Sequence, residues 1–408
     1  MRRGRYLTLA AAVVMLGCTA TDDVGGGSPS PSDEPDVPSL TVWADPTIAP
    51  ALEEVVEAFE DAESVRVSVE ALDPAVIEED LVAQGPFGQG PDVVVAPHTT
   101  LGYLIENGAV VPLDLADAAE RYPAVALDAV TFSGLGYGVP VTLDARALVR
   151  NRDLAPLEPT SWEDLQATGR PPGEEADLER VTAFPLDPDA HPALDVFSLQ
   201  SSFGVEVFGR DEAGGWDPSV LLLGDENGLA AADALGAWSA EGLLSSAITA
   251  GVAQDLFVDG RVVYWLTDLG GARAATAAGV DIGVSAVPTP TERPASPFVV
   301  VATAMVSNYS DSKDLAQSLA LTLTGHAVAE ALEDAGLVPA LQAPSTDVSL
   351  AAWRDVAVGG HAVPNVSEMD RVWPAWDQAV LDIVDGAPDP RRRWSTMAQD
   401  VGTALGAS

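Results

Sequence analysis

The chain has 408 residues, and 47% of them are hydrophobic, which provides a large core and excludes a disordered chain. Its 62 acidic residues against 20 lysines and arginines give a formal net charge of −42. Phosphate groups and anionic lipids require clustered cations, so this balance argues against a nucleic-acid partner and against electrostatic attachment to a membrane. The acidity indicates a solvated, self-repelling surface, which would also suit a saline or cell-surface habitat.

Residues 1–17 have the pattern of a secretory signal peptide. Arginines at positions 2, 3 and 5 precede the apolar stretch 7–16, which is too short to span a bilayer. Cys18 follows directly and is the only cysteine, so it can form neither an internal disulfide nor a multi-cysteine metal site. Residues 15–18 (MLGC) resemble the lipobox of bacterial lipoproteins, in which this cysteine carries the lipid. The alternative is an ordinary secretory signal with an incidental cysteine.

Residues 18–39 are rich in glycine, serine, proline and acidic residues, and they contain almost nothing to bury. This composition is typical of a flexible tether. No later stretch is long and apolar enough for a transmembrane helix. We therefore expect a body displayed on the outer face of the cell membrane and attached through lipidated Cys18 alone.

The body begins with alternating strand and helix patterns. We expect strands at residues 40–43, 65–70 and 92–96, and helices at residues 48–62, 74–84 and 99–107. Gly108 is placed to end the last of these helices. Such alternation predicts an α/β fold with mostly parallel sheets, in which ligands lie beyond the carboxyl ends of the strands. This singles out residues 44–47 and 97–100.

Several short motifs, in order and spacing, resemble the family 1 extracellular solute-binding proteins, the maltose-binding-protein-like family of bacterial ABC sugar importers. The opening matches at residues 40–43 (LTVW) and 90–93 (GPDV). Further matches are residues 106–113 (ENGAVVPL), 137–140 (YGVP), 151–154 (NRDL), 161–165 (SWEDL), 257–264 (FVDGRVVY), 287–290 (VPTP) and 363–365 (VPN). Each motif is short, but the ordered set runs from about residue 40 to the C-terminus.

The resemblance implies a periplasmic-binding-protein-like fold of two α/β lobes, joined by a hinge of two or three chain crossings. By position, the N-terminal lobe takes residues 37–141 plus 282–323, and the C-terminal lobe takes residues 142–281 plus 324–408. The implied function is capture of a sugar or oligosaccharide in the interlobe cleft and delivery to an ABC transporter permease. We expect a monomeric binding protein with no catalytic activity and no cofactor.

Sugar sites combine flat aromatic faces with groups that pair hydroxyls. Trp373 matches the family's stacking tryptophan, with interlobe packing as the alternative. Asp144 matches a family carboxylate that binds hydroxyls, with a hinge or surface role as the alternative. The remaining candidates for ligand contact are Trp265, Trp376, Trp43, Asp45, Asp268, Asp189, His98 and Thr99. Core packing is the alternative for the tryptophans, and a satisfied structural residue is the alternative for His98.

The chain also departs from the family's maltose contacts. Ala96, Thr99 and Thr100 stand where maltose-binding protein carries a tryptophan and an Asp–Arg pair, and Gly270 replaces another tryptophan. Residues 188–190 (PDA) lack the aromatic of its Glu-Pro-Tyr loop. We therefore expect a solute other than maltose. Alternatives are a polyamine, iron-complex or peptide binder, or a secreted glycosidase. No nucleophile elbow, phosphate loop or His-Glu-x-x-His motif occurs, and no histidines have metal-ligand spacing.

Overall fold

The structure is a computed structural model that describes residues 37–168, 180–342, 345 and 347–406. The folded body begins at Pro38. The predicted signal peptide, Cys18 and all but the end of the predicted tether lie outside the described residues. Within the described ranges, no helix is both long and apolar enough to cross a membrane.

The first sheet is built on the three strands predicted at the start of the body. β1 (Ser39–Ala44) pairs in parallel with β2 (Arg66–Ala71) and with β3 (Val93–Pro97). The side chains of residues 93–96 are all buried, as expected for a strand covered on both faces. β13 (Phe298–Val306) lies antiparallel to β3 and also pairs with β6 (Val139–Ala145) and β14 (His361–Ala362).

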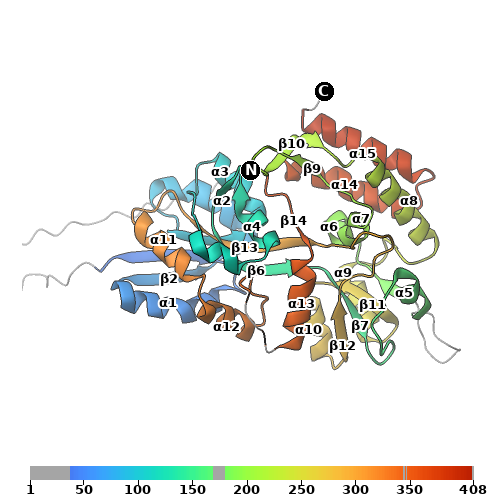
Figure 1. The fold of residues 1–408 in the computed structure, drawn as a ribbon, viewed down its shortest axis with the longest axis horizontal. Helices are drawn as coiled ribbons and strands as arrows, with labels where there is room; N and C mark the ends of the chain where they lie inside the picture. Colours follow the sequence, from blue (N-terminus) through green and yellow to red (C-terminus); the bar gives the residue numbers. More distant parts are fainter. Residues whose placement is uncertain (1–36, 169–179, 343–344, 346, 407–408) are drawn as a thin grey trace, which may run out of the picture. The chain divides into compact units, whose positions relative to one another are not determined.

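The helices around this sheet follow the predicted pattern. α1 (Ala49–Glu63) buries Leu52, Val55, Val56 and Phe59, and α12 (His326–Asp334) packs beside it (Figure 1). Gly108 follows α3 (Leu101–Glu106) with a φ of 63°, which confirms its predicted helix-ending role. The other elements of this half are α2 (Pro74–Gln84), η1 (Gly85–Phe87), η2 (His98–Thr100), α3 (Leu101–Glu106), η3 (Ala116–Arg121), α4 (Ala124–Val130), β4 (Thr131–Phe132), β5 (Leu135–Gly136) and α11 (Lys313–Thr322).

The second sheet has the strand order β12 (Ile282–Ser285), β7 (Ala147–Asn151), β11 (Val262–Thr267), β8 (Arg180–Ala183). β11 and β8 are parallel, whereas β7 is antiparallel to both of its neighbours. The expectation of a mostly parallel sheet is therefore wrong for this half. β11 and β12 run in the same direction because α10 connects them, and β7, which enters from β6 of the first sheet, lies between them in the opposite direction.

The remaining helices surround the second sheet, and β9 and β10 form a separate hairpin. These elements are α5 (Trp162–Thr168), α6 (Pro192–Asp195), α7 (Phe197–Ser201), β9 (Phe208–Arg210), β10 (Trp216–Leu221), α8 (Glu226–Ala240), α9 (Ala250–Val258), α10 (Leu269–Ala277), α13 (Val348–Val358), α14 (Met369–Val384) and α15 (Pro390–Ala404). Residues of β11 contribute to both large cores, Val262 and Trp265 to one and Val263 and Leu266 to the other, and all six residues of the strand are buried. The sheet is thus buried on both sides.

Two short connections lead directly from one sheet to the other, and a third leads from the first sheet to a helix of the second half. Arg146 alone separates β6 from β7, residues 286–297 connect β12 to β13, and residues 363–368 connect β14 to α14. These pairings differ from our predicted lobe boundaries. β12, expected in the first lobe, pairs in the second sheet; β14 pairs in the first sheet and α12 packs on α1, although both were expected in the second lobe. The cue for residue 282 was the proline-rich turn at 288–290, which follows β12 by only two residues.

Candidate functional site

A charged cluster lies where the chain first crosses between the sheets. Arg146 donates from Nε to Asp195 Oδ1 at 2.7 Å and from Nη1 to Asp268 Oδ2 at 2.6 Å. Asp144 lies two residues earlier, near the end of β6, where its backbone pairs with Val300. One guanidinium at the crossing thus joins carboxylates that are 49 and 122 residues away in the sequence.

Local structure fixes both partners of Arg146. Asp268 directly follows β11 and caps α10, because its Oδ1 accepts a hydrogen bond from Gly271 N at 2.8 Å. Its second oxygen remains available to the guanidinium. Gly271 permits this cap, since a Cβ there would lie 2.2 Å from Thr267 Oγ1 and 2.7 Å from Trp265. Asp195 ends α6, and its side chain is only 8% exposed.

The surroundings shift the proton affinities of this cluster. Burial raises the pKa of Asp144 to about 6, against the opposing charge of Arg146. Asp144 is nevertheless exposed to solvent. Burial also raises the pKa of Asp195. Burial disfavours the charged form of Arg146, but the carboxylates around it outweigh this effect and raise its pKa.

An aromatic group lies beside this cluster. The rings of Trp373 and Trp376 are parallel within 3°, with centroids 5.5 Å apart, and Phe298 meets both edge-on. The imidazole of His191 lies 4.9 Å from Trp373, centroid to centroid, and its Nδ1 is 2.8 Å from Asp377 Oδ2. The charge of Asp195 helps to raise the pKa of His191, so the rings and the charged cluster share one electrostatic environment.

Trp373, Asp144 and Asp268 are the predicted contacts that the structure brings into this region. Trp373 is 8% exposed, and its role as a ligand platform remains a prediction. Asp45 is partly exposed and accepts both hydrogen bonds of Thr47, at 2.6 Å each. Thr99 is partly exposed in η2, and Asp189 is exposed in the loop before α6. No contact in the described part of the chain links these last three to Arg146.

Three predicted tryptophan contacts are corrected, because their rings belong to the core. Trp376 is fully buried, and its Nε1 donates to Gln200 Oε1 at 3.0 Å. Trp43 is 4% exposed and donates to Glu70 Oε2 at 3.0 Å. Trp265 is 2% exposed and packs against Phe257. The strand of Trp43 was predicted correctly, but in all three cases the side chain points to the interior.

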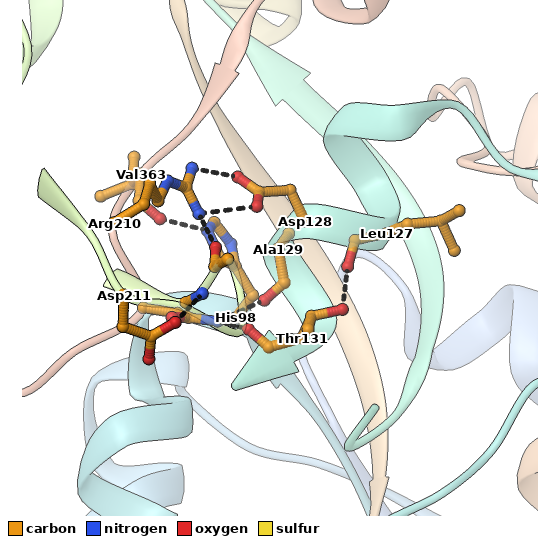
Figure 2. A network of polar contacts seen from close by, with 11 residues as sticks. His98, Leu127, Asp128, Ala129, Thr131, Arg210, Asp211 and Val363 are labelled. Atoms are coloured by element: carbon orange, nitrogen blue, oxygen red, sulfur yellow. Dashed lines mark hydrogen bonds and ion pairs between the residues drawn. The ribbon is translucent and has the colours of Figure 1, made fainter. Parts of the chain in front are cut away.

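His98 is also corrected, and Figure 2 shows why. The side chain is fully buried, Val301 N–H donates to its Nδ1 at 3.0 Å, and its Nε2 donates to Val363 O at 2.8 Å. Burial lowers the pKa of His98 to about 4, so the ring is neutral. With both nitrogens occupied by the backbone, His98 ties β13 to the segment after β14 and has no group left for a solute.

The same view shows a second ion pair between distant segments. Arg210 of the β9–β10 hairpin forms two hydrogen bonds of 2.8 Å to the carboxylate of Asp128 on α4 (Figure 2). Its guanidinium also lies 3.3 Å from the ring centroid of Trp216. This arrangement fastens the hairpin to the first half of the molecule.

Sequence reasoning missed Arg146, Asp195, His191 and Asp377. No local motif connects them, since each pairs with a residue far away in the chain. The sequence offered one signal, the scarcity of cations. In a strongly acidic chain, an arginine between two consecutive strands is expected to form ion pairs with carboxylates. His191 stood directly before a proline in the loop that we considered only for Asp187 and Asp189.

Two large surface hollows lie elsewhere. One of about 880 Å³ is lined by residues of β8 and α9 and the turn after α8, and one of about 1010 Å³ by residues of α10, β12 and α13. Neither contains Asp144, Arg146, His191 or Trp373. We therefore define the candidate site by its charged and aromatic side chains and not by the volume of a surface hollow. Among the described residues, no three histidines, cysteines or acids are grouped to hold a metal ion.

Comparison with known proteins decides the family. Residues 54–358 match the family described as bacterial extracellular solute-binding protein. The chain belongs to this family. The relatives include the galactooligosaccharide-binding protein of Bacillus subtilis (strain 168), 24% identical over 96% of this chain and 94% of the relative. Another is a maltooligosaccharide ABC transporter solute-binding lipoprotein of Streptococcus pneumoniae (strain ATCC BAA-255 / R6), 23% identical over 98% and 94%.

Solved structures agree in fold. A cyclo/maltodextrin-binding protein complexed with maltotetraose has a TM-score of 0.81 at 22% identity, covering 92% of this chain and 98% of that one. A maltose-binding periplasmic protein from Listeria monocytogenes, in complex with maltose, also scores 0.81 at 24% identity, covering 91% and 98%. These neighbours confirm the two-lobe α/β fold of solute-binding proteins that the sequence predicted.

Proposed function

We propose that the protein captures an oligosaccharide and delivers it to an ABC transporter permease. Its family and relatives are binding proteins, and the names of the two relatives above refer to oligosaccharides. The observation that carries the proposal is the pairing of Asp144, Arg146 and Asp268 with a group of aromatic rings at the crossing between the sheets. Carboxylates and a guanidinium pair sugar hydroxyls, and rings pack against the apolar face of a pyranose.

Maltose itself is not the solute we propose. The positions of its family contacts are occupied by Ala96, Thr99, Thr100 and Gly270, which provide neither rings nor charges. A longer or differently linked saccharide would depend more on the charged cluster at Arg146.

A second candidate is a cationic solute such as a polyamine. Asp144, Asp195 and Asp268 face one cation, Arg146, so the cluster holds more negative than positive charge. A polyamine would replace the hydroxyl contacts by ion pairs with these carboxylates.

Thermal unfolding with a solute panel tests the proposal. Maltotriose, maltotetraose, galactooligosaccharides, putrescine and spermidine are added to the mature body, and the melting temperature is recorded. A solute that binds only the folded state at 100 times its Kd stabilises it by about 2.7 kcal/mol. We expect a shift with an oligosaccharide. A shift with the amines alone would refute the sugar function and support the second candidate.

We also propose that the protein binds its solute without hydrolysing it. Chromogenic glycosides incubated with the protein at high concentration should release no chromophore. Steady release, absent from a heat-inactivated sample, would identify a glycosidase instead.

The attachment proposal concerns residues 1–39, with a signal peptide cleaved before Cys18 and a tether after it. The relative from Streptococcus pneumoniae is described as a lipoprotein. Cys18→Ser should leave the body folded but release it from the membrane or stall its processing. Full membrane retention of the variant after a high-salt wash would contradict lipid anchoring.

A further inference from the structure

In the aromatic group beside Arg146, the ring that solvent reaches is that of His191. Trp376 is fully buried and Trp373 is 8% exposed, whereas the side chain of His191 is 52% exposed. The imidazole packs against Trp373 at a centroid separation of 4.9 Å and a tilt of 32°. A solute that approaches these rings therefore meets His191 first, with the tryptophans behind it.

The imidazole is held in place. Asp377 Oδ2 lies 2.8 Å from Nδ1, and the other carboxylate oxygen accepts a hydrogen bond from Ala193 N at 3.0 Å. Asp377 itself is only 13% exposed and lies on α14, one residue after Trp376. Because Nδ1 is occupied, Nε2 is the nitrogen left to bond something outside the protein. Among the described residues, none forms a hydrogen bond with this nitrogen.

The residues around His191 favour its charged form. The hydrogen bond to Asp377 raises the pKa of His191 most, burial opposes it, and the charges of Asp195 and Asp370 add to the rise. Asp195 is the last residue of α6, which begins directly after His191. The carboxylate of Asp195 also forms the ion pair with Arg146. The exposed ring thus adjoins the charged cluster through one short helix.

We propose that His191 is a solute contact, with its ring face against the apolar face of a pyranose and Nε2 directed to a hydroxyl. This inference rests on the proposed oligosaccharide function. The role expected of Trp373 changes accordingly: it backs the imidazole and keeps it flat against the solute. A ring held by a stacked partner and a carboxylate loses little conformational freedom on binding, which favours affinity.

The experiment measures the affinity of the wild type and three variants for the tightest oligosaccharide of the thermal panel, by isothermal titration calorimetry. His191→Ala should weaken binding about tenfold or more, each tenfold step being about 1.4 kcal/mol. His191→Phe retains a ring and should recover part of that loss. His326→Ala is the matched control, since His326 is an exposed histidine at the start of α12, and it should bind as the wild type does.

A second readout separates contact from structural support. In protein with ¹⁵N-labelled histidine, the Nε2 resonance of His191, assigned by its absence from His191→Phe, should shift when the oligosaccharide is added. The wild type should also lose affinity as the pH rises through the pKa of His191. His191→Phe should lack that component.

The outcomes are distinct. Wild-type protein that binds no oligosaccharide of the panel refutes the sugar function and this contact with it. Wild-type protein that binds, together with a folded His191→Ala that binds equally well and a His191 resonance that does not move, overturns the contact and leaves the sugar function standing.

Discussion

Replacing Arg146 by methionine tests the centre of the charged cluster. Methionine keeps most of the apolar stem but leaves Asp195, whose side chain is 8% exposed, without its cation. Breaking a buried ion pair from one side costs about 3–5 kcal/mol, because the remaining charge is buried without compensation. Arg146 is 29% exposed, so we expect the lower end, about 3 kcal/mol at pH 7.5. The pair with Asp268, 42% exposed, adds at most about 1 kcal/mol.

The loss should depend on pH with a definite sign. The pKa values of Asp144 and Asp195 are raised by burial, so each contributes stability below its unfolded pKa and loses it as the pH rises through its folded pKa. Without Arg146 both values rise further, since the opposing charge is gone. Lowering the pH from 7.5 to 5 therefore protonates more of the cluster in the variant than in the wild type, and the destabilisation should shrink.

Urea unfolding, followed by the fluorescence of the nine tryptophans, measures both effects. The matched control is Arg152→Met, which removes a pair with Asp281 of 3.1 Å whose side chains are 47% and 62% exposed. It should cost at most about 1 kcal/mol and depend little on pH. A loss below about 1 kcal/mol for Arg146→Met at pH 7.5, or an undiminished loss at pH 5, would refute the reasoning.

Three further substitutions test the surrounding framework by the same urea assay. His98→Ala leaves Val301 N–H and Val363 O unpaired and should cost roughly 2–6 kcal/mol, at about 1–3 kcal/mol for each group. Because burial lowers the pKa of His98 to about 4, the variant should also lack the wild type's loss of stability as pH falls from 6.5 toward 4. Gly102→Ala should cost about 1–3 kcal/mol, since its Cβ would meet Ser367 N at 2.7 Å and Asn365 O at 2.8 Å, while Gly251→Ala, with open space around it, should be neutral or stabilising. Arg210→Lys should lower the free energy of unfolding as much as Arg210→Met does, by about 1 kcal/mol or less, because lysine cannot bond both oxygens of Asp128. A lysine variant as stable as the wild type would contradict a role for the two parallel hydrogen bonds.

The strands and helices could be predicted because their signals are local. α1 has buried residues at helical spacing, β3 is a short apolar run after a glycine–proline turn, and Gly108 ends α3. By contrast, no local signal shows to which sheet a short strand belongs. β12 has four residues with no pattern that distinguishes a partner in one sheet from a partner in the other, so its assignment was wrong.

The candidate site was predictable only in part, for a related reason. Position after a strand drew attention to His98, and Asp268 was among the candidate carboxylates, but position does not say where a side chain points. Asp268 faces Arg146, whereas His98 turns inward to the backbone of Val301 and Val363. Trp373 and Trp376 are one helical turn apart, so the spacing indicates a shared face. The spacing does not indicate that His191, 182 positions before Trp373, packs against the ring of Trp373.

The charge balance of the whole chain explains why the site is built around a guanidinium. With 62 acids and 20 cations, of which Lys313 is the sole lysine, each cation has several carboxylates to neutralise. A guanidinium can serve two at once in fixed directions, as Arg146 does for Asp195 and Asp268 and Arg391 does for Glu226 and Asp233. At Arg146 both directions are already taken by the protein. An anionic solute would therefore find no unshared cation there and would meet Asp144 instead, so the cluster disfavours acidic sugars and suits neutral hydroxyls or amines.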